Sequence, residues 1–110
     1  MSDLLGTIES LADCYAKGSL QPSRVVAAHI DQITKKDPRL GAFQHVFFDE
    51  AMQQAVAADR ALAAGYNLGP FHGIPFALKD IYECKGQMCT HGSMAHKGRI
   101  STMTGPVVHR

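Results

Sequence analysis

The sequence has few of the features that indicate a disulfide-rich domain, a membrane anchor or a nucleic-acid-binding surface. Its three cysteines, an odd number at irregular spacing, do not make a disulfide framework. Eleven Lys and Arg stand against ten Asp and Glu, and no basic block is longer than Lys35-Lys36, so charge alone does not indicate binding to nucleic acid.

Long apolar runs are also missing. No run is long enough to span a bilayer, and the start, MSDLLGTIESLADC, carries acids where a signal peptide would carry basic residues. At 110 residues the chain is one domain or part of one. We therefore expect a soluble, cytoplasmic protein without a membrane partner.

Helical periodicity is present in the first half of the chain. A helix is predicted over residues 7–17, with Thr7 as its N-cap and Gly18 as its stop. A second helix is predicted over residues 23–36, and Pro38 is expected to end it because the residue before a proline resists the helical conformation.

Between and after the helices the pattern changes. Residues 39–48 alternate as an extended segment would, and an alanine-rich helix is predicted over 49–64. Seven of the ten glycines then lie in residues 65–110, where one strand, over 76–81, is predicted among loops. Near the end, Thr104 as N-cap and a following Pro106 predict a helix start, which indicates the front part of a longer chain.

Lys79 stands out because it interrupts the apolar stretch IPFALKDIY. In a strand Asp80 would point to the opposite face, so it is a poor ion-pair partner for Lys79. Apolar neighbours disfavour the charged ammonium, and a neutral amine is a competent general base. The alternative is an ordinary lysine at an exposed strand end, which reaches solvent with its long stem.

The segment GPFHGIPFALKD, residues 69–80, resembles the signature of the amidase signature family. The stretches DPRLGAF, FDEAMQQAVAADRALAAG and CKGQMCTHGS are also similar to that family's pattern, so the likeness covers essentially the whole chain. It implies an α/β class, with N-terminal helices and the first strands of a mixed-sheet α/β/α fold that this chain leaves incomplete. Residues 1–110 would be the N-terminal portion of a single amidase domain, helical over 1–67 and glycine-rich over 68–110.

The resemblance further implies an amide hydrolase with a Ser–cis-Ser–Lys triad, in which Lys79 is the base. The two serines belong to a Gly/Ser-rich segment that these residues do not contain. Ser93 matches a serine of a supporting Gly-Ser element, and Ser101 has no matching context. No cofactor or metal is implied. The expected partners are a small-molecule amide and either a second copy or an amidotransferase complex.

Three other interpretations remain open. Cys84, Cys89, His91 and His96 have the outer spacings of zinc ligands, but the single residue between the two pairs leaves little chain to wrap a metal. His72 is a base by type, although a role in holding the Gly-Pro turn fits it better. The chain could also be a truncated, inactive paralogue or a scaffold piece that binds a partner.

Overall fold

The computed structural model describes residues 2–110. The chain divides into two compact units, Met1–Pro75 and Phe76–Arg110, and each is described by itself. Among the described residues, no helix combines the length and the apolar character that crossing a membrane requires.

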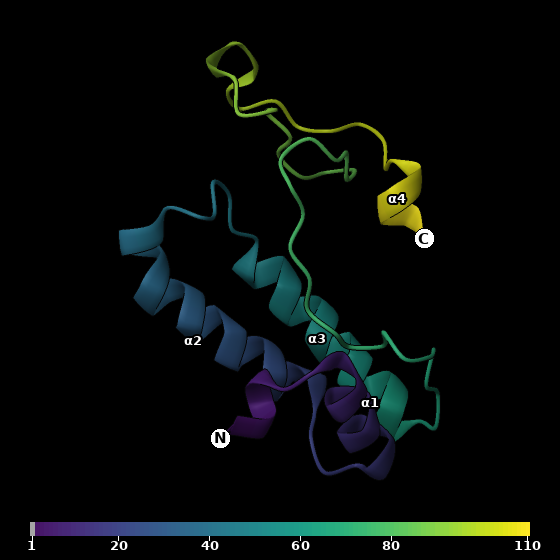
Figure 1. Cartoon of the computed structure of the whole chain (residues 1–110). Helices are drawn as coiled ribbons and strands as arrows, with labels where there is room; N and C mark the ends of the chain where they lie inside the picture. The colour runs from purple at the N-terminus through teal and green to yellow at the C-terminus, as the bar shows by residue number, and fades with distance from the viewer. Residues whose placement is uncertain (1) are drawn as a thin grey trace. The chain divides into compact units, whose positions relative to one another are not determined.

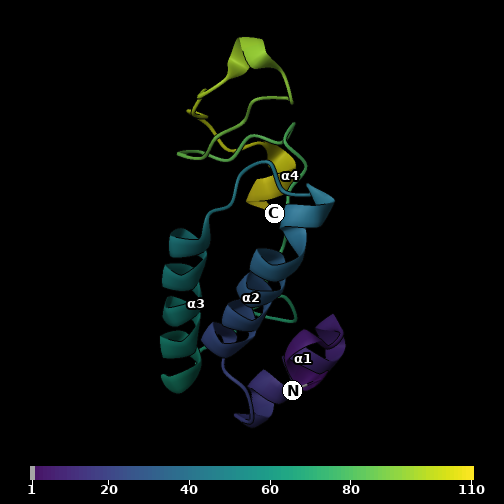
Figure 2. The same cartoon turned by 90° about the vertical axis from the view of Figure 1, so that its left-hand side faces the viewer.

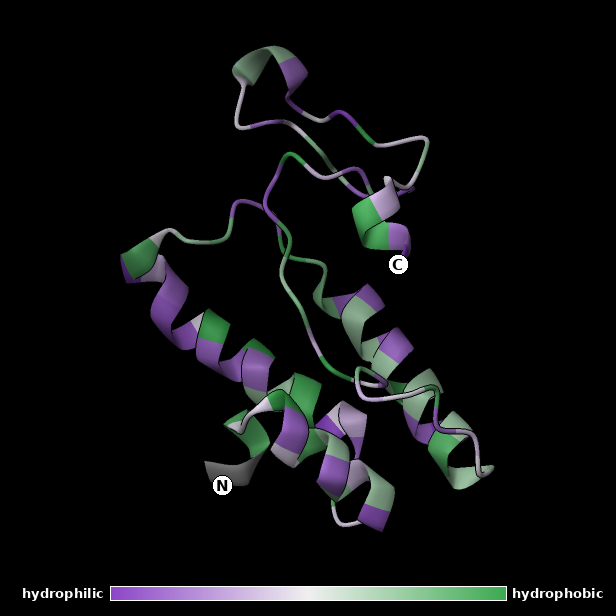
Figure 3. Cartoon of the chain, turned by 45° about the vertical axis from the view of Figure 1, so that its right-hand side comes forward, coloured by the Kyte–Doolittle hydropathy of each residue, from purple (hydrophilic) through white to green (hydrophobic). Residues whose placement is uncertain are grey.

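The first unit is helical. Its helices α2 and α3 pack along each other, and α1 lies beside the first turns of α2 (Figures 1 and 2). Hydrophobic and hydrophilic bands alternate along α2 and α3, as expected of helices that bury one face (Figure 3). The elements are the 3₁₀ helix η1 (Ser2–Leu5), α1 (Ile8–Lys17), α2 (Pro22–Leu40) and α3 (Phe48–Ala63).

Helix α1 begins and ends where the sequence predicts. The Thr7 hydroxyl accepts a hydrogen bond from the Ser10 N–H at 3.2 Å, which satisfies one of the free donors of the first turn. Gly18 adopts the left-handed conformation, with φ of 72°, and its N–H returns to the carbonyls of the last turn. The N-cap and the stop are both confirmed.

Helix α2 is capped from another helix. Its N-cap residue, Gln21, makes no capping hydrogen bond with its side chain, and the Asp59 carboxylate of α3 instead accepts from the Ser23 N–H at 3.0 Å. A carboxylate at this end also complements the positive end of the helix dipole.

The predicted end of the second helix at Pro38 is wrong, because α2 continues through this proline to Leu40. Pro38 lies in the last turn, where the helix lacks the one backbone hydrogen bond that the proline nitrogen cannot donate and continues for only two more residues. The stop is supplied by Gly41, with φ of 62°, and by the Asp37 carboxylate, which accepts from the N–H groups of Ala42 and Phe43 at 2.7 and 3.1 Å.

The extended segment predicted over residues 39–48 is also wrong. Its first two residues belong to α2, its last begins α3, and residues 41–47 form no strand. The third helix is confirmed to within a residue at each end. Gly65 follows it with φ of 88°, in the left-handed region expected for a residue that terminates a helix.

The core of the first unit brings together residues from all of its helices and from the segments after α1 and α3. Its buried members are Leu11, Tyr15 and Val25, and four half-buried side chains pack against them: Leu4, Leu20, Leu62 and Ile74. Ile74 comes from the glycine-rich turn that precedes Lys79. The turn is therefore fixed to the helical core by apolar packing.

The second unit contains no strand among its described residues, so the strand predicted over 76–81 is wrong. Within residues 76–110, the one β-bridge joins Met88 to Ile100. A lone extended segment without a paired neighbour is not stable as a strand, and no second strand lies within residues 2–110 to pair with it. The part of the chain that the structure describes is thus helical, and the expected α/β class is not shown within it.

Two short helices complete the second unit: η2 (Met94–His96) and α4 (Pro106–His109). The start of α4 agrees with the predicted proline in the first turn, but its N-cap is Gly105 and not Thr104. The Thr104 hydroxyl instead accepts from the Lys85 N–H at 3.1 Å. This hydrogen bond joins two loops, so the hydroxyl does not cap α4.

Candidate active site

The turn that leads to Lys79 is held by His72. Its Nδ1 accepts a hydrogen bond from the Leu68 N–H at 3.3 Å, and its Nε2 lies 3.1 Å from the carbonyl oxygen of Ala58 in α3. Because Nδ1 is an acceptor, Nε2 carries the hydrogen and donates to Ala58. The imidazole thus uses both nitrogens to fasten the turn, in agreement with the structural role expected for it.

Gly73 is the tightest point of the same turn. Its φ is 72°, and a Cβ built there would lie 2.5 Å from Cγ of Pro22, so no larger residue fits without displacement. The Tyr15 hydroxyl donates to the Gly73 carbonyl at 3.1 Å. Burial, and then the charge of Asp59, raise the pKa of Tyr15 from 10.0 to about 12, so this phenol remains a donor at any physiological pH.

Lys79 itself is exposed and lies in an irregular segment of the second unit. Its carbonyl accepts from the Tyr82 N–H at 3.1 Å, which closes a turn directly after it. The burial that a strand would have given Lys79 is therefore not supplied within residues 2–110. Neighbouring apolar side chains are exposed as well: Phe76, Leu78, Ile81 and Tyr82.

Asp80 anchors the chain immediately after Lys79. Its carboxylate accepts from the Thr90 N–H at 2.9 Å and also from the Thr90 hydroxyl. Thr90 is buried, with 3% of its surface exposed. Hydrogen bonds to a carboxylate are stronger than those between neutral groups. The backbone that carries Lys79 is thereby tied to residue 90 on one side, as His72 ties the preceding turn to α3.

Glu83 is the centre of a polar network. It accepts from the Ser101 hydroxyl, and Nη2 of Arg99 lies 2.9 Å from its Oε1. The Ser101 hydrogen bond, and then the Arg99 hydrogen bond, lower the pKa of the Glu83 carboxyl below its usual value. Ser101 is 2% exposed and spends its hydroxyl on this carboxylate. It has the setting of a structural residue.

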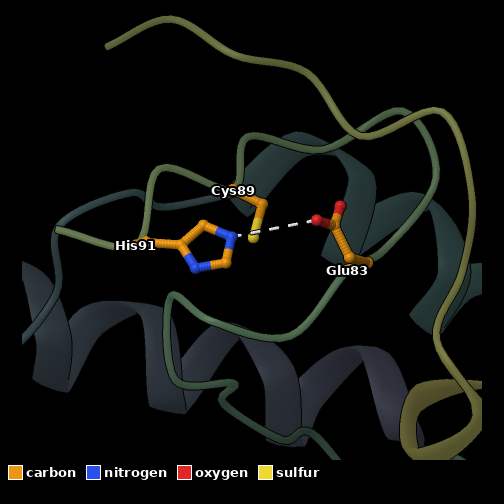
Figure 4. Close-up of side chains that lie close together, drawn as sticks. All are labelled: Glu83, Cys89 and His91. Atoms are coloured by element: carbon orange, nitrogen blue, oxygen red, sulfur yellow. Dashed lines mark ion pairs between the residues drawn. The ribbon is translucent and has the colours of Figure 1, made fainter. Parts of the chain in front are cut away.

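The Cys/His group weighed from the sequence is only partly assembled. One donor atom each from Glu83, Cys89 and His91 lie within 4.8 Å of one another, and the three side chains point into the same space (Figure 4). The His96 ring lies against that of His91, with 5.7 Å between centroids. Cys84 is not in this cluster. Glu83 is outside the Cys/His spacing pattern, and its only signal in the sequence is its position six residues before Cys89.

Ser93, the other serine considered, accepts from the Ala95 N–H at 3.3 Å and caps η2. It is exposed and has a local structural task.

Comparison with known proteins decides the family. A family model described as Amidase matches residues 24–110. The chain belongs to the amidase family. This match includes the segment 69–80 and confirms the resemblance on which the assignment from the sequence rested.

The curated relatives agree with this assignment. Over its whole length the chain is 40% identical to a protein of Acidothermus cellulolyticus and 37% identical to one of Streptomyces coelicolor. Both are named as a subunit of glutamyl-tRNA(Gln) amidotransferase. A protein of Protochlamydia amoebophila with the same name is 35% identical over 76% of the chain. The chain spans 22% of the length of the first two relatives and 17% of the third. No solved structure matches the chain.

Proposed function

We propose that the protein hydrolyses carbon–nitrogen bonds of amides and that Lys79 is its general base. The observation that carries this proposal is the family match over residues 24–110, which includes the motif around Lys79. The anchoring of the chain on both sides of Lys79, by His72 and by Asp80, supports it, since a base must be held in place to be efficient.

In the proposed reaction the neutral Lys79 amine takes a proton from a bridging serine. That serine takes the proton of a second serine, whose oxygen attacks the amide carbonyl. The amine leaves with a proton, an acyl-enzyme remains, and water releases the acid. No segment among these 110 residues matches the one that carries the two serines, so we propose that they come from sequence outside them.

The exposed state of Lys79 is compatible with this chemistry if its surroundings are covered in the working protein. Phe76 is 73% exposed, and Leu78 and Ile81 are 40% and 45% exposed. Several exposed apolar side chains close together in the sequence are typical of a segment that packs against other protein. Covering it would also remove water from Lys79 and so favour the neutral amine that the reaction needs.

The names of the relatives favour one cellular role. We propose that the protein is the amidase component of a tRNA-dependent amidotransferase, which would work in the cytoplasm and release ammonia from an amide donor for a partner protein. A free-standing amidase is the competing assignment. Co-purification of the protein with other subunits, and transamidation of glutamyl-tRNA by the purified complex, would separate the two.

Substitution of Lys79 in the protein as it is isolated from its source tests the chemistry. Lys79→Ala should lower kcat by about a hundredfold or more, because a positioned base contributes about that much. Lys79→Arg should fail as well, since a guanidinium cannot give up its proton. The matched control is Lys85, another exposed lysine of the same unit, and Lys85→Ala should leave turnover unchanged. Turnover retained by Lys79→Ala would overturn the proposal.

A second candidate role is suggested by the exposed apolar surface. A piece that serves only to bind a partner would keep its interactions in both Lys79 variants and would show no amide hydrolysis in any form. This role is favoured if the isolated wild-type protein lacks hydrolytic activity and its complexes are unaffected by Lys79→Ala.

A further inference from the structure

We propose that Glu83, Cys89 and His91 form a binding site for a divalent transition-metal ion of the zinc type, with His96 placed to supply a fourth ligand. The site lies in the second unit and is separate in its chemistry from the proposed amide hydrolysis. It does not depend on Lys79 being a general base.

The geometry of the three side chains supports a shared ligand. Their donor atoms lie within 4.8 Å of one another (Figure 4). Ligand atoms around a tetrahedral zinc ion are about 3.5 Å apart, because zinc bonds to nitrogen, oxygen and sulfur are about 2.0 to 2.3 Å long. Binding would thus need the donors to approach by about an ångström. His91 can supply this movement, since 45% of its side chain is exposed.

The kinds of donor atom select the class of metal. A thiolate, an imidazole and a carboxylate suit Zn²⁺ or Co²⁺, whereas Ca²⁺ and Mg²⁺ prefer oxygen ligands alone. A thiolate and a carboxylate also supply negative charge for the ion, although the carboxylate of Glu83 is shared with Arg99. Cys89 is 1% exposed, so its sulfur would be shielded from solvent at the site.

The ligands are held by a second layer of contacts. The Ser101 hydroxyl and the Arg99 guanidinium orient the Glu83 carboxylate, and Arg99 also donates to the Cys89 carbonyl at 3.1 Å. The Cys89 N–H donates in turn to the Arg99 carbonyl at 3.1 Å. Such outer contacts fix the orientation of ligands in metal sites. Residues 83, 89 and 99 are thereby joined before any ion arrives.

His91 and His96 lie at the open side of the site. His91 has φ of 55°, in the left-handed region that residues other than glycine seldom adopt. The His96 ring, on η2, lies 5.7 Å from the His91 ring, centroid to centroid. The His96 side chain is exposed, and if it turns its nitrogen toward the ion the site has four protein ligands, as structural zinc sites do.

A bound ion would also act on the segment that carries Lys79. Cys89 is followed by Thr90, which holds the Asp80 carboxylate. Fixing Cys89 would therefore stabilise the anchor of the residue next to Lys79, because an ion that binds the folded form stabilises it.

Titration with Co²⁺ alone, in place of zinc, tests the proposal on the purified full chain. Cobalt bound to a thiolate gives an intense charge-transfer band in the near ultraviolet, which should saturate at one ion per chain. The band should be lost in Cys89→Ser and kept in Cys84→Ser, its matched control outside the cluster. His91→Ala should weaken binding of Co²⁺ by about tenfold to a hundredfold.

His91→Ala keeps the test decisive if Cys89→Ser does not fold, since the His91 side chain is exposed and its removal should leave the circular dichroism spectrum unchanged. His109→Ala, in α4, is the control for loss of a histidine and should bind as the wild type does. The proposal is overturned if excess Co²⁺ gives no charge-transfer band, if the band survives in folded Cys89→Ser, or if His91→Ala binds with unchanged affinity.

Discussion

The two units of this chain are stabilised in different ways. The first unit, up to Pro75, buries apolar side chains between helices, with Leu11, Tyr15 and Val25 at its centre. The buried residues of the second unit are Cys89, Thr90 and Ser101, of which two are polar and spend their hydroxyls on carboxylates. The first unit therefore depends mainly on the hydrophobic effect, and the second on charge-assisted hydrogen bonds.

This difference matters for the site because the motif around Lys79 crosses from one unit to the other. The turn with His72 and Gly73 belongs to the first unit, whereas Lys79 and Asp80 belong to the second. Substitutions that alter apolar packing should thus destabilise the turn before Lys79. Substitutions that remove a charge should destabilise the residues after it. Each side of this contrast can be tested separately.

The largest expected effect is that of Gly73→Ala on the first unit. The new Cβ would lie 2.5 Å from Cγ of Pro22 and would also require a left-handed backbone, with φ of 72°. Left-handed strain costs about 1–2 kcal/mol, and overpacking adds about 1–3 kcal/mol. The free energy of unfolding, measured by urea denaturation, should fall by roughly 2–5 kcal/mol.

Gly18→Ala is the matched control, because Gly18 has the same φ of 72° and no atom lies within 4 Å of the position that its new methyl group would take. It should show the backbone cost of about 1–2 kcal/mol alone. Equal losses in the two variants would mean that the contact with Pro22 relaxes freely and that the turn is not packed tightly against the helices.

The next effect concerns the Tyr15 hydroxyl at high pH. The pKa of Tyr15 is about 12 when folded against 10.0 for an ordinary phenol, so above pH 10 the unfolded chain loses its proton first. Stability must then fall as the pH rises from 10 to 12, by a total of about 2–3 kcal/mol. Tyr15→Phe should abolish this alkaline loss. At neutral pH it should cost about 1 kcal/mol, for the hydrogen bond to Gly73.

Tyr66→Phe provides the comparison, since Tyr66 is 68% exposed and belongs to the same unit. Unfolding curves measured at several alkaline pH values, up to the folded pKa of about 12, should show the same loss in this variant as in the wild type. An alkaline loss that persists in Tyr15→Phe would show that another group causes it.

The helices of the first unit could be predicted because their signals are local. The apolar spacing of residues 7–17 and the capping residues Thr7 and Gly18 act within one or two turns. The end of α2 could not be predicted from Pro38. A residue before a proline disfavours the helical conformation, but contacts of Asp37 and Gly41 close the helix at a later position. The cap of α2 by Asp59 could not be predicted from local patterns, because it joins residues 36 positions apart.

The second unit was harder to predict because its contacts are non-local and polar. The apolar stretch around Lys79 matches a strand by composition, but a strand needs a partner to pair with, and none lies within residues 2–110. The importance of Lys79 came from the motif and its family, not from periodicity. The role of Glu83 cannot be predicted from local sequence, because its partners, Ser101 and Arg99, follow it by 18 and 16 residues.

The smallest expected effect is on the titration of Glu83. Its folded pKa lies below the ordinary value of 4.5, first because Ser101 donates to the carboxylate and then because Arg99 does. A lowered pKa contributes stability at pH values above the ordinary one, and this contribution is lost as the pH falls through the folded pKa. Ser101→Ala should move the Glu83 pKa back toward 4.5, as measured by carbon-13 NMR of the side-chain carboxyl.

Thr102→Ala is the matched control, because Thr102 is adjacent and exposed and the substitution likewise removes a hydroxyl. It should leave the Glu83 pKa where it is. Arg99→Gln should raise the pKa too, because it weakens a hydrogen bond to the carboxylate and removes a positive charge beside it. If Arg99→Gln has the larger effect of the two, the second unit depends on its ion pair more than on the buried hydroxyl. Its stability should then fall with added salt, which screens charges and leaves the apolar core of the first unit intact.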